Sequence, residues 1–274
     1  VTPSGLIVIK DNVKDKLLFF EPNGKFVKER IDIEGGMDLA FIDEHSIAFD
    51  TFTSHAPTKE KFKGASLAVC DGDNNIQYLF GENIAEENVF NVRRPECLYR
   101  YGNKAYFAPH WDKNIYEVTT DSIIAKYRLE FLPDDVLNYK FKTSDELNTL
   151  MKDYPFFNGS FIEMQDYTWL RYMSQEEISP SILYSHKDKK TYSIYYEFNN
   201  PLYIYLQKPM ALYKGNTIAE VVPALYLYIN KNAIEETLGE TDFTKNLFRD
   251  FKLDDNPIVF LFTFKDDISK YVIK

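Results

Sequence analysis

The chain has 274 residues, of which 45% are hydrophobic and 16% aromatic, so it can bury a large core and is not a disordered chain. Its formal net charge is −10 and it has no stripe of Lys and Arg, so repulsion from phosphate makes nucleic acid an unexpected partner. No stretch approaches the roughly 18 to 20 apolar residues that a membrane-spanning helix needs, so no transmembrane segment is expected.

The first predicted elements are a short apolar strand and a β-hairpin. Residues 19–30 alternate apolar and polar side chains on both sides of the turn Pro22-Asn23-Gly24. The same succession returns along the chain. The strands are expected at 6–11, 46–52, 104–110, 167–173 and 217–224, and the hairpins that follow them at 19–30, 67–80, 115–129 and 182–198.

One more strand and a tight turn precede four of these five strands. The inner turns lie near Glu44, Gly102, Gln165 and Gly215, about 50 to 63 residues apart. A four-stranded antiparallel unit that recurs at such intervals is typical of a β-propeller blade. The sequence therefore predicts an all-β fold, a single propeller domain over 1–274 with five recognisable blades; a sandwich of paired hairpins would explain the alternation but not the recurrence.

Insertions lengthen the repeat and add short helices. Residues 144–154 have a possible N-cap and apolar residues at helical spacing, and residues 233–239 read as a second short helix that ends on Gly. The closing strand, 257–265, is nearly all apolar, so we expect it to be buried between neighbouring blades. The missing strand of the first blade is supplied either by residues 270–274 or by residues that precede Val1.

Three segments resemble a known family. They are KLLFFEPNGKFVKE at 16–29, the stretch 96–135 that begins ECLYRYGNKAYFAPHWDKN and ends LPDD, and DDNPIVFLFTFK at 254–265. They are similar to the six-bladed β-propeller proteins of Bacteroidales, which are related to the NHL-repeat propellers. The resemblance implies six blades and a secreted protein, periplasmic or on the cell surface, typically an outer-membrane lipoprotein. It implies no common reaction.

The connections differ between the two rims of such a propeller. The a–b and c–d turns are tight, whereas the d–a and b–c connections are long, and long loops carry function more often than tight turns do. We therefore expect the ligand on the long-loop rim, although tolerated insertions would produce the same asymmetry. On that rim His110, Trp111 and Asp112 form a candidate sugar- or peptide-binding corner. Alternatively, Trp111 fills a gap between blades and Asp112 bonds its own turn.

Other candidate ligand residues are charged. Arg93 and Arg94 precede a strand and suit a carboxylate or sulfate, unless they pair with nearby Glu. Arg171 lies in a predicted inner strand, but alternation does not decide whether it faces the channel. His55 shares the long-loop rim with His110.

The sequence predicts no metal and no cofactor. The four histidines are scattered, and DGDNN at 71–75 has Ile76 where a calcium loop needs glycine, so we interpret it as a turn. We interpret Cys70 and Cys97 as small buried residues rather than a disulfide.

No catalytic motif is present, so we favour a non-catalytic ligand-binding or protein-interaction module of the bacterial cell envelope. The expected partners are a glycan, a peptide or an envelope protein, and the expected state is a monomer. The alternative is a propeller hydrolase or lyase that acts on a glycan or peptide at the channel mouth.

Overall fold

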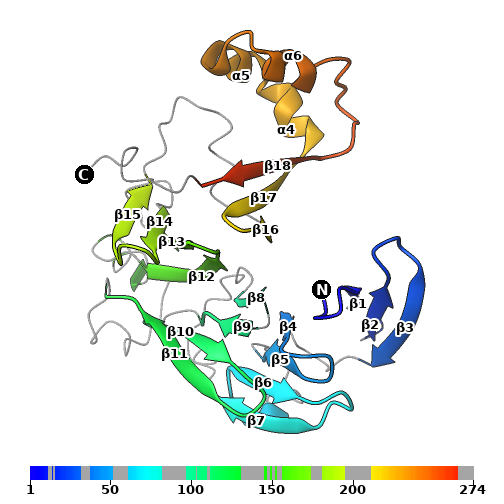
Figure 1. The fold of residues 1–274 in the computed structure, drawn as a ribbon, viewed down its shortest axis with the longest axis vertical. Helices are drawn as coiled ribbons and strands as arrows, with labels where there is room; N and C mark the ends of the chain where they lie inside the picture. The colour runs from blue at the N-terminus through cyan, green and yellow to red at the C-terminus, as the bar shows by residue number, and fades with distance from the viewer. Residues whose placement is uncertain are drawn as a thin grey trace. The chain divides into compact units, whose positions relative to one another are not determined.

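A computed structural model describes most of the chain and shows five antiparallel sheets in chain order (Figure 1). The described residues are 1–11, 14, 16–31, 38–51, 61–81, 97–102, 104–109, 112–130, 145, 146, 149, 152, 156–173, 181–194 and 211–264. The chain divides into two compact units, Val1–Gly159 and Ser160–Lys274, which are described in turn. That residues 1–274 form one domain stays a prediction.

The first unit contains three sheets. The first consists of β1 (Ile7–Asp11), β2 (Lys16–Phe20) and β3 (Phe26–Ile31). The second consists of β4 (Leu39–Phe41), β5 (Ile47–Asp50), β6 (Leu67–Cys70) and β7 (Ile76–Phe80). The third consists of β8 (Leu98–Tyr101), β9 (Lys104–Phe107), β10 (Asn114–Val118) and β11 (Ile123–Arg128). Each strand pairs with its chain neighbour, so the predicted four-stranded units are confirmed.

The second sheet is buried on both faces. Side chains of one face pack with the first sheet; they include Phe41, Ile47, Phe49, Ala68 and Cys70. Side chains of the other face pack with the third sheet; they include Ala40, Ile42, Ala48, Leu67 and Val69. Alternate residues of β5 and β6 thus enter different cores, which explains why both strands are apolar apart from Asp50 at the end of β5.

The tight turns have the residues that their conformations require. Gly102 between β8 and β9 and Gly215 in the second unit have φ of 59° and 54°, where a side chain would be strained. At the β4–β5 turn, Asp43 Oδ1 accepts hydrogen bonds from the backbone nitrogens of His45 and Ser46, both at 2.7 Å. The predicted inner turns are confirmed.

Asp38 joins the second sheet to the third. Its Oδ2 accepts hydrogen bonds from the backbone nitrogens of Cys97 at 2.9 Å and Leu98 at 2.7 Å, and its Oδ1 accepts one from Leu39 at 2.8 Å. Two of these donors are the first residue of β8, the first strand of the next sheet, and the residue just before it. The carboxylate therefore pairs backbone groups where the ladders of the two sheets end.

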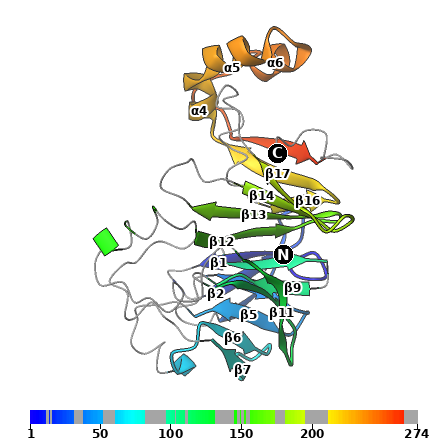
Figure 2. The same cartoon turned by 90° about the vertical axis from the view of Figure 1, so that its left-hand side faces the viewer.

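The second unit contains two sheets and a helical insertion. The fourth sheet consists of β12 (Phe156–Glu163), whose start crosses the division between the units, β13 (Tyr167–Met173), β14 (Ser181–Ser185) and β15 (Thr191–Ile194). The fifth consists of β16 (Ala211–Lys214), β17 (Thr217–Val222) and β18 (Ile258–Thr263). Three helices separate β17 from β18 in the chain. Figure 2 labels them above β17. They are α4 (Ala224–Ile229), α5 (Lys231–Leu238) and α6 (Asp242–Leu247).

The helix predicted at 233–239 is α5, whose C-cap is Gly239 with φ of 69°. Its neighbours α4 and α6 were not predicted. Their apolar residues pack with β17 and β18 in one core that includes Leu227, Ile234 and Phe260. Four residues of the predicted helix at 144–154 are described (Asp145, Glu146, Thr149 and Lys152), and all four are helical.

The prediction that the closing strand is buried was wrong. In β18, Val259 and Leu261 are 57% and 52% exposed, while Phe260 between them is 8% exposed. Only one face of the strand packs on the helices, and its apolar composition concealed this alternation. Residues 270–274 lie outside the described residues. Cys70 and Cys97 are buried and do not form a disulfide, as predicted.

Candidate functional site

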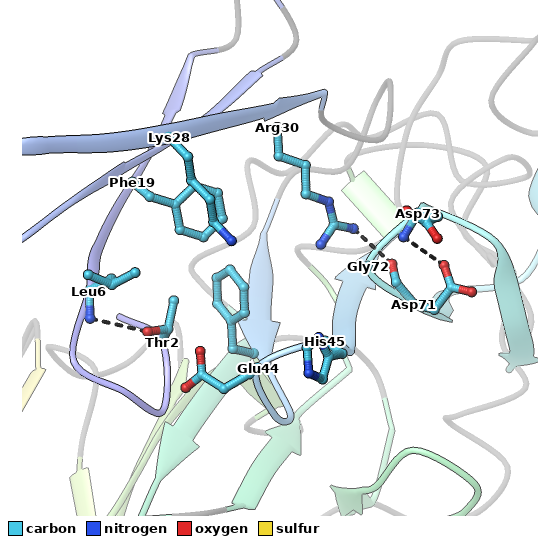
Figure 3. Close-up of a pocket in the computed structure, with 11 residues that line it drawn as sticks. Thr2, Leu6, Phe19, Lys28, Arg30, Glu44, His45, Asp71, Gly72 and Asp73 are labelled. Atoms are coloured by element: carbon cyan, nitrogen blue, oxygen red, sulfur yellow. Dashed lines mark hydrogen bonds between the residues drawn. The ribbon is translucent and has the colours of Figure 1, made fainter.

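A cavity of about 450 Å³ lies between the first and second sheets, on the side of the tight turns (Figure 3). It is lined by charged side chains over an apolar base that includes Leu6, Phe19 and Phe41. The charged groups come from β3 and from the β4–β5 and β6–β7 turns. They are Lys28, Arg30, Glu44, His45, Asp71 and Asp73.

The cavity exists because the outer strand of the first sheet has charged residues at inward positions. In this sheet Leu17 and Phe19 of β2 enter the core, and their partners on β3 are Arg30 and Lys28. At the equivalent places of the second sheet, Leu67 and Val69 of β6 are paired with Phe80 and Tyr78. Those two aromatic residues pack against the core with the third sheet, whereas Arg30 and Lys28 leave space.

The wall of the cavity formed by β3 is cationic. Lys28 and Arg30 are two residues apart and so project from the same face, while Glu29 between them pairs with Lys16 at 2.6 Å. Lys28 Nζ lies 5.0 Å from the centre of the Phe19 ring, and no carboxylate in the described ranges is within ion-pair distance of it. Arg30 Nη2 donates a hydrogen bond of 2.9 Å to the carbonyl oxygen of Asp71.

The opposite wall is a turn that carries Glu44 and His45. Lys28 and Arg30 project toward this turn from β3 (Figure 3). Ser4 donates to the Glu44 carboxylate from its backbone nitrogen and, at 3.1 Å, from its hydroxyl. These bonds hold an exposed carboxylate at the edge of the cavity. His45 is exposed beside it.

The carboxylate of Asp71 accepts hydrogen bonds within its own turn. Its Oδ1 accepts hydrogen bonds from the backbone nitrogens of Asp73 and Asn75, and its Oδ2 accepts one from the Asn75 side chain. The hydrogen bond from the Asn75 side chain is the main reason why the pKa of Asp71 is below its ordinary value. With Asn74 at φ of 65°, this confirms that residues 71–75 form a turn.

Most of the ligand residues predicted from the sequence lie outside the described residues: His55, Arg93, Arg94, His110 and Trp111. The expectation that the long-loop rim binds the ligand therefore stays a prediction.

Asp112 is described and bonds its own loop. Its Oδ1 accepts hydrogen bonds from the backbone nitrogen of Asn114 at 2.9 Å and from that side chain at 3.0 Å, and its Oδ2 accepts one from the Tyr116 hydroxyl at 2.8 Å. Burial, together with this hydrogen bond, raises the pKa of Tyr116 to about 12. These contacts agree with the structural alternative stated for Asp112.

Arg171 belongs to β13 in the second unit and is 9% exposed. Its strand partner is Ser181 of β14, which is fully buried. Arg171 is therefore enclosed by protein, and its role in ligand binding stays a prediction.

The second unit has a polar cluster of its own. The Thr168 hydroxyl donates a hydrogen bond of 2.8 Å to Glu163 Oε2 and lies 2.8 Å from His186 Nε2. Thr168 and Glu163 are 1% and 6% exposed, so neither side chain is open to a substrate. The cluster connects β12, β13 and the residue that follows β14, which is a structural role.

Sequence reasoning missed the cavity. The motif GKFVKER at 24–30 was interpreted only as one arm of a hairpin, and its inward Lys and Arg were not noticed. The available signal was the contrast with the second hairpin, which carries Tyr78 and Phe80 at the equivalent positions.

Comparisons with known proteins identify the family and the fold. The profile of a family described as "6-bladed beta-propeller" matches residues 3–222. The chain is also similar in structure to a candidate exported protein from Bacteroides fragilis. The TM-score is 0.67 and the sequence identity 17%, over 95% of this chain and 75% of that one. No curated protein matches the chain.

None of the helices described is both long and hydrophobic enough to span a bilayer. Within the described ranges, His, Cys, Asp and Glu form no group of three that could hold a metal ion.

Proposed function

We propose that this chain, which belongs to the 6-bladed β-propeller family, is a non-catalytic ligand-binding module of the bacterial cell envelope. The observation that carries the proposal is the cavity of about 450 Å³ between the first two sheets. Its size is in the usual range for small-molecule sites, and its charged groups converge from three separate segments.

Two carboxylates at the cavity, those of Asp71 and Glu44, suit binding better than catalysis. A general acid or base needs a proton that it can exchange near neutral pH. Asp71 is held in its ionised form by hydrogen bonds that lower its pKa, and two hydrogen bonds from Ser4 hold the Glu44 carboxylate in place. Groups held in this way suit the recognition of a charged ligand.

The envelope location is supported by similarity. The structurally similar protein from Bacteroides fragilis is described as a candidate exported protein. We propose that this chain is exported as well, and more specifically that it is attached to the membrane as a lipoprotein.

The test is a thermal-shift screen of the purified chain against a panel of glycans and peptides. A ligand that binds the folded state raises the melting temperature by mass action. The shift should disappear in Lys28→Met, which removes the cavity ammonium but keeps an unbranched side chain over Phe19. It should persist in Lys126→Met, because Lys126 is also on an outer strand and 6.0 Å from an aromatic ring centre, but not at the cavity. Chemical turnover of a panel member without a stable shift would favour the hydrolase or lyase instead.

A further inference from the structure

We infer that the cavity between the first two sheets binds a compact zwitterion, such as a short unblocked peptide, through its carboxylate and its ammonium group. This inference rests on the proposed function and adds the chemical class of the ligand. It follows from how charge is distributed over the two walls.

The cationic wall would receive the carboxylate. Lys28 and Arg30 project from one face of β3 into the same space (Figure 3). The Lys28 ammonium makes no ion pair with described residues and rests on the face of Phe19, so it is available to an anion. A carboxylate here would replace water around an ammonium group whose position the Phe19 ring already restricts.

The opposite wall would receive the ammonium group. Glu44 is held by two hydrogen bonds from Ser4, so its carboxylate does not have to be ordered when a ligand binds. Its exposure leaves room for a further donor at the same oxygens. Asp73 adds a second negative charge to the lining.

Opposite charges on facing walls discriminate among ligand classes. A simple anion would be attracted by Lys28 but repelled by Glu44 and Asp73, and a simple cation would meet the reverse. A ligand with one charge of each sign satisfies both walls. The apolar base of Leu6, Phe19 and Phe41 suits a small side chain between the two charges.

The contrast between the sheets indicates that the charges are not needed for packing. The second sheet closes the equivalent space with Phe80 and Tyr78, which pack against the next sheet. The first sheet could be closed in the same way, yet it places Arg30 and Lys28 there. Substitution Lys28→Tyr should therefore fill the cavity without unfolding the protein.

The experiment is calorimetric titration of the whole chain with Ala-Ala, N-acetyl-Ala-Ala, Ala-Ala amide and galacturonate. We expect Ala-Ala to bind, and each blocked form to bind at least about tenfold more weakly, because each lacks one charged contact. Lys28→Met should weaken Ala-Ala binding by a similar factor but should not further weaken the binding of Ala-Ala amide, which has no carboxylate. Glu44→Gln should weaken Ala-Ala binding but not that of the acetylated form. Glu29→Gln is the control, since Glu29 points to the other face of β3.

Equal binding of Ala-Ala and its blocked forms, or binding of galacturonate alone, would overturn the zwitterion. If galacturonate binds and Lys28→Met abolishes that binding, the proposed ligand-binding function stands and only the ligand class is wrong. If Lys28→Met and Lys28→Tyr keep full Ala-Ala affinity while their melting temperatures match the wild type, the site is not this cavity.

Discussion

The hydrogen bonds of Asp38 lead to a sharp prediction about how two sheets are held together. In the wild type, the two carboxylate oxygens of Asp38 accept hydrogen bonds from three backbone nitrogens. In Asp38→Asn only one oxygen, that of the amide, remains as an acceptor. Either the two donors from Cys97 and Leu98 or the one from Leu39 must then face an NH₂ group. A hydrogen bond to a charged acceptor contributes about 1.5 to 3 kcal/mol, and Asp38 is only half-buried. We therefore expect the free energy of unfolding to fall by about 2 to 4 kcal/mol.

The assay combines urea denaturation with amide hydrogen exchange, because exchange reports where the loss occurs. The amides of Cys97 and Leu98 should exchange faster in Asp38→Asn, while those of β14 in the second unit should not change. Asp43→Asn is the matched control, since Asp43 also accepts from two backbone nitrogens but only within its own turn. If the amides of 97 and 98 keep wild-type protection in Asp38→Asn, the reasoning about this carboxylate is refuted.

Three further predictions concern other parts of the chain. Thr168→Val removes the hydroxyl that bonds a buried carboxylate, and urea denaturation should show a loss of about 1 to 3 kcal/mol. Gly81→Ala should lower the melting temperature more than Gly24→Ala. Both glycines have positive φ, but of the two only Gly81 has a neighbour that the new Cβ would meet, the hydroxyl oxygen of Ser66. Burial raises the pKa of Cys70 to about 11 from 9.0, so the folded state keeps its proton after the unfolded state has lost it. Stability should therefore be complete below pH of about 9 and should fall as the pH rises through about 11, with a shallower fall in Cys70→Ala.

The sequence by itself determined the strands, their order and the class of fold. Alternation within each hairpin and the residues of its turn are local properties, so Pro22-Asn23-Gly24 and the segment 71–75 could be assigned as turns from their residues alone. Burial was harder to predict where composition was uniform. β18 was expected to be buried because nearly all of it is apolar. Val259 and Leu261 are nevertheless exposed, since only one face of β18 packs on the helices α4 to α6.

The candidate site was decided by tertiary structure. Lys28 and Arg30 look like ordinary polar positions of a hairpin until the first sheet is placed against the second, and Arg30 then reaches a turn 41 residues away. Asp38 likewise acts on backbone groups 59 and 60 residues further along the chain. Strand periodicity reports which side chains share a face, but it carries no information about what that face meets, because the partner comes from another part of the chain. For this reason the repeat could be predicted from the residues, whereas the cavity that it encloses could not.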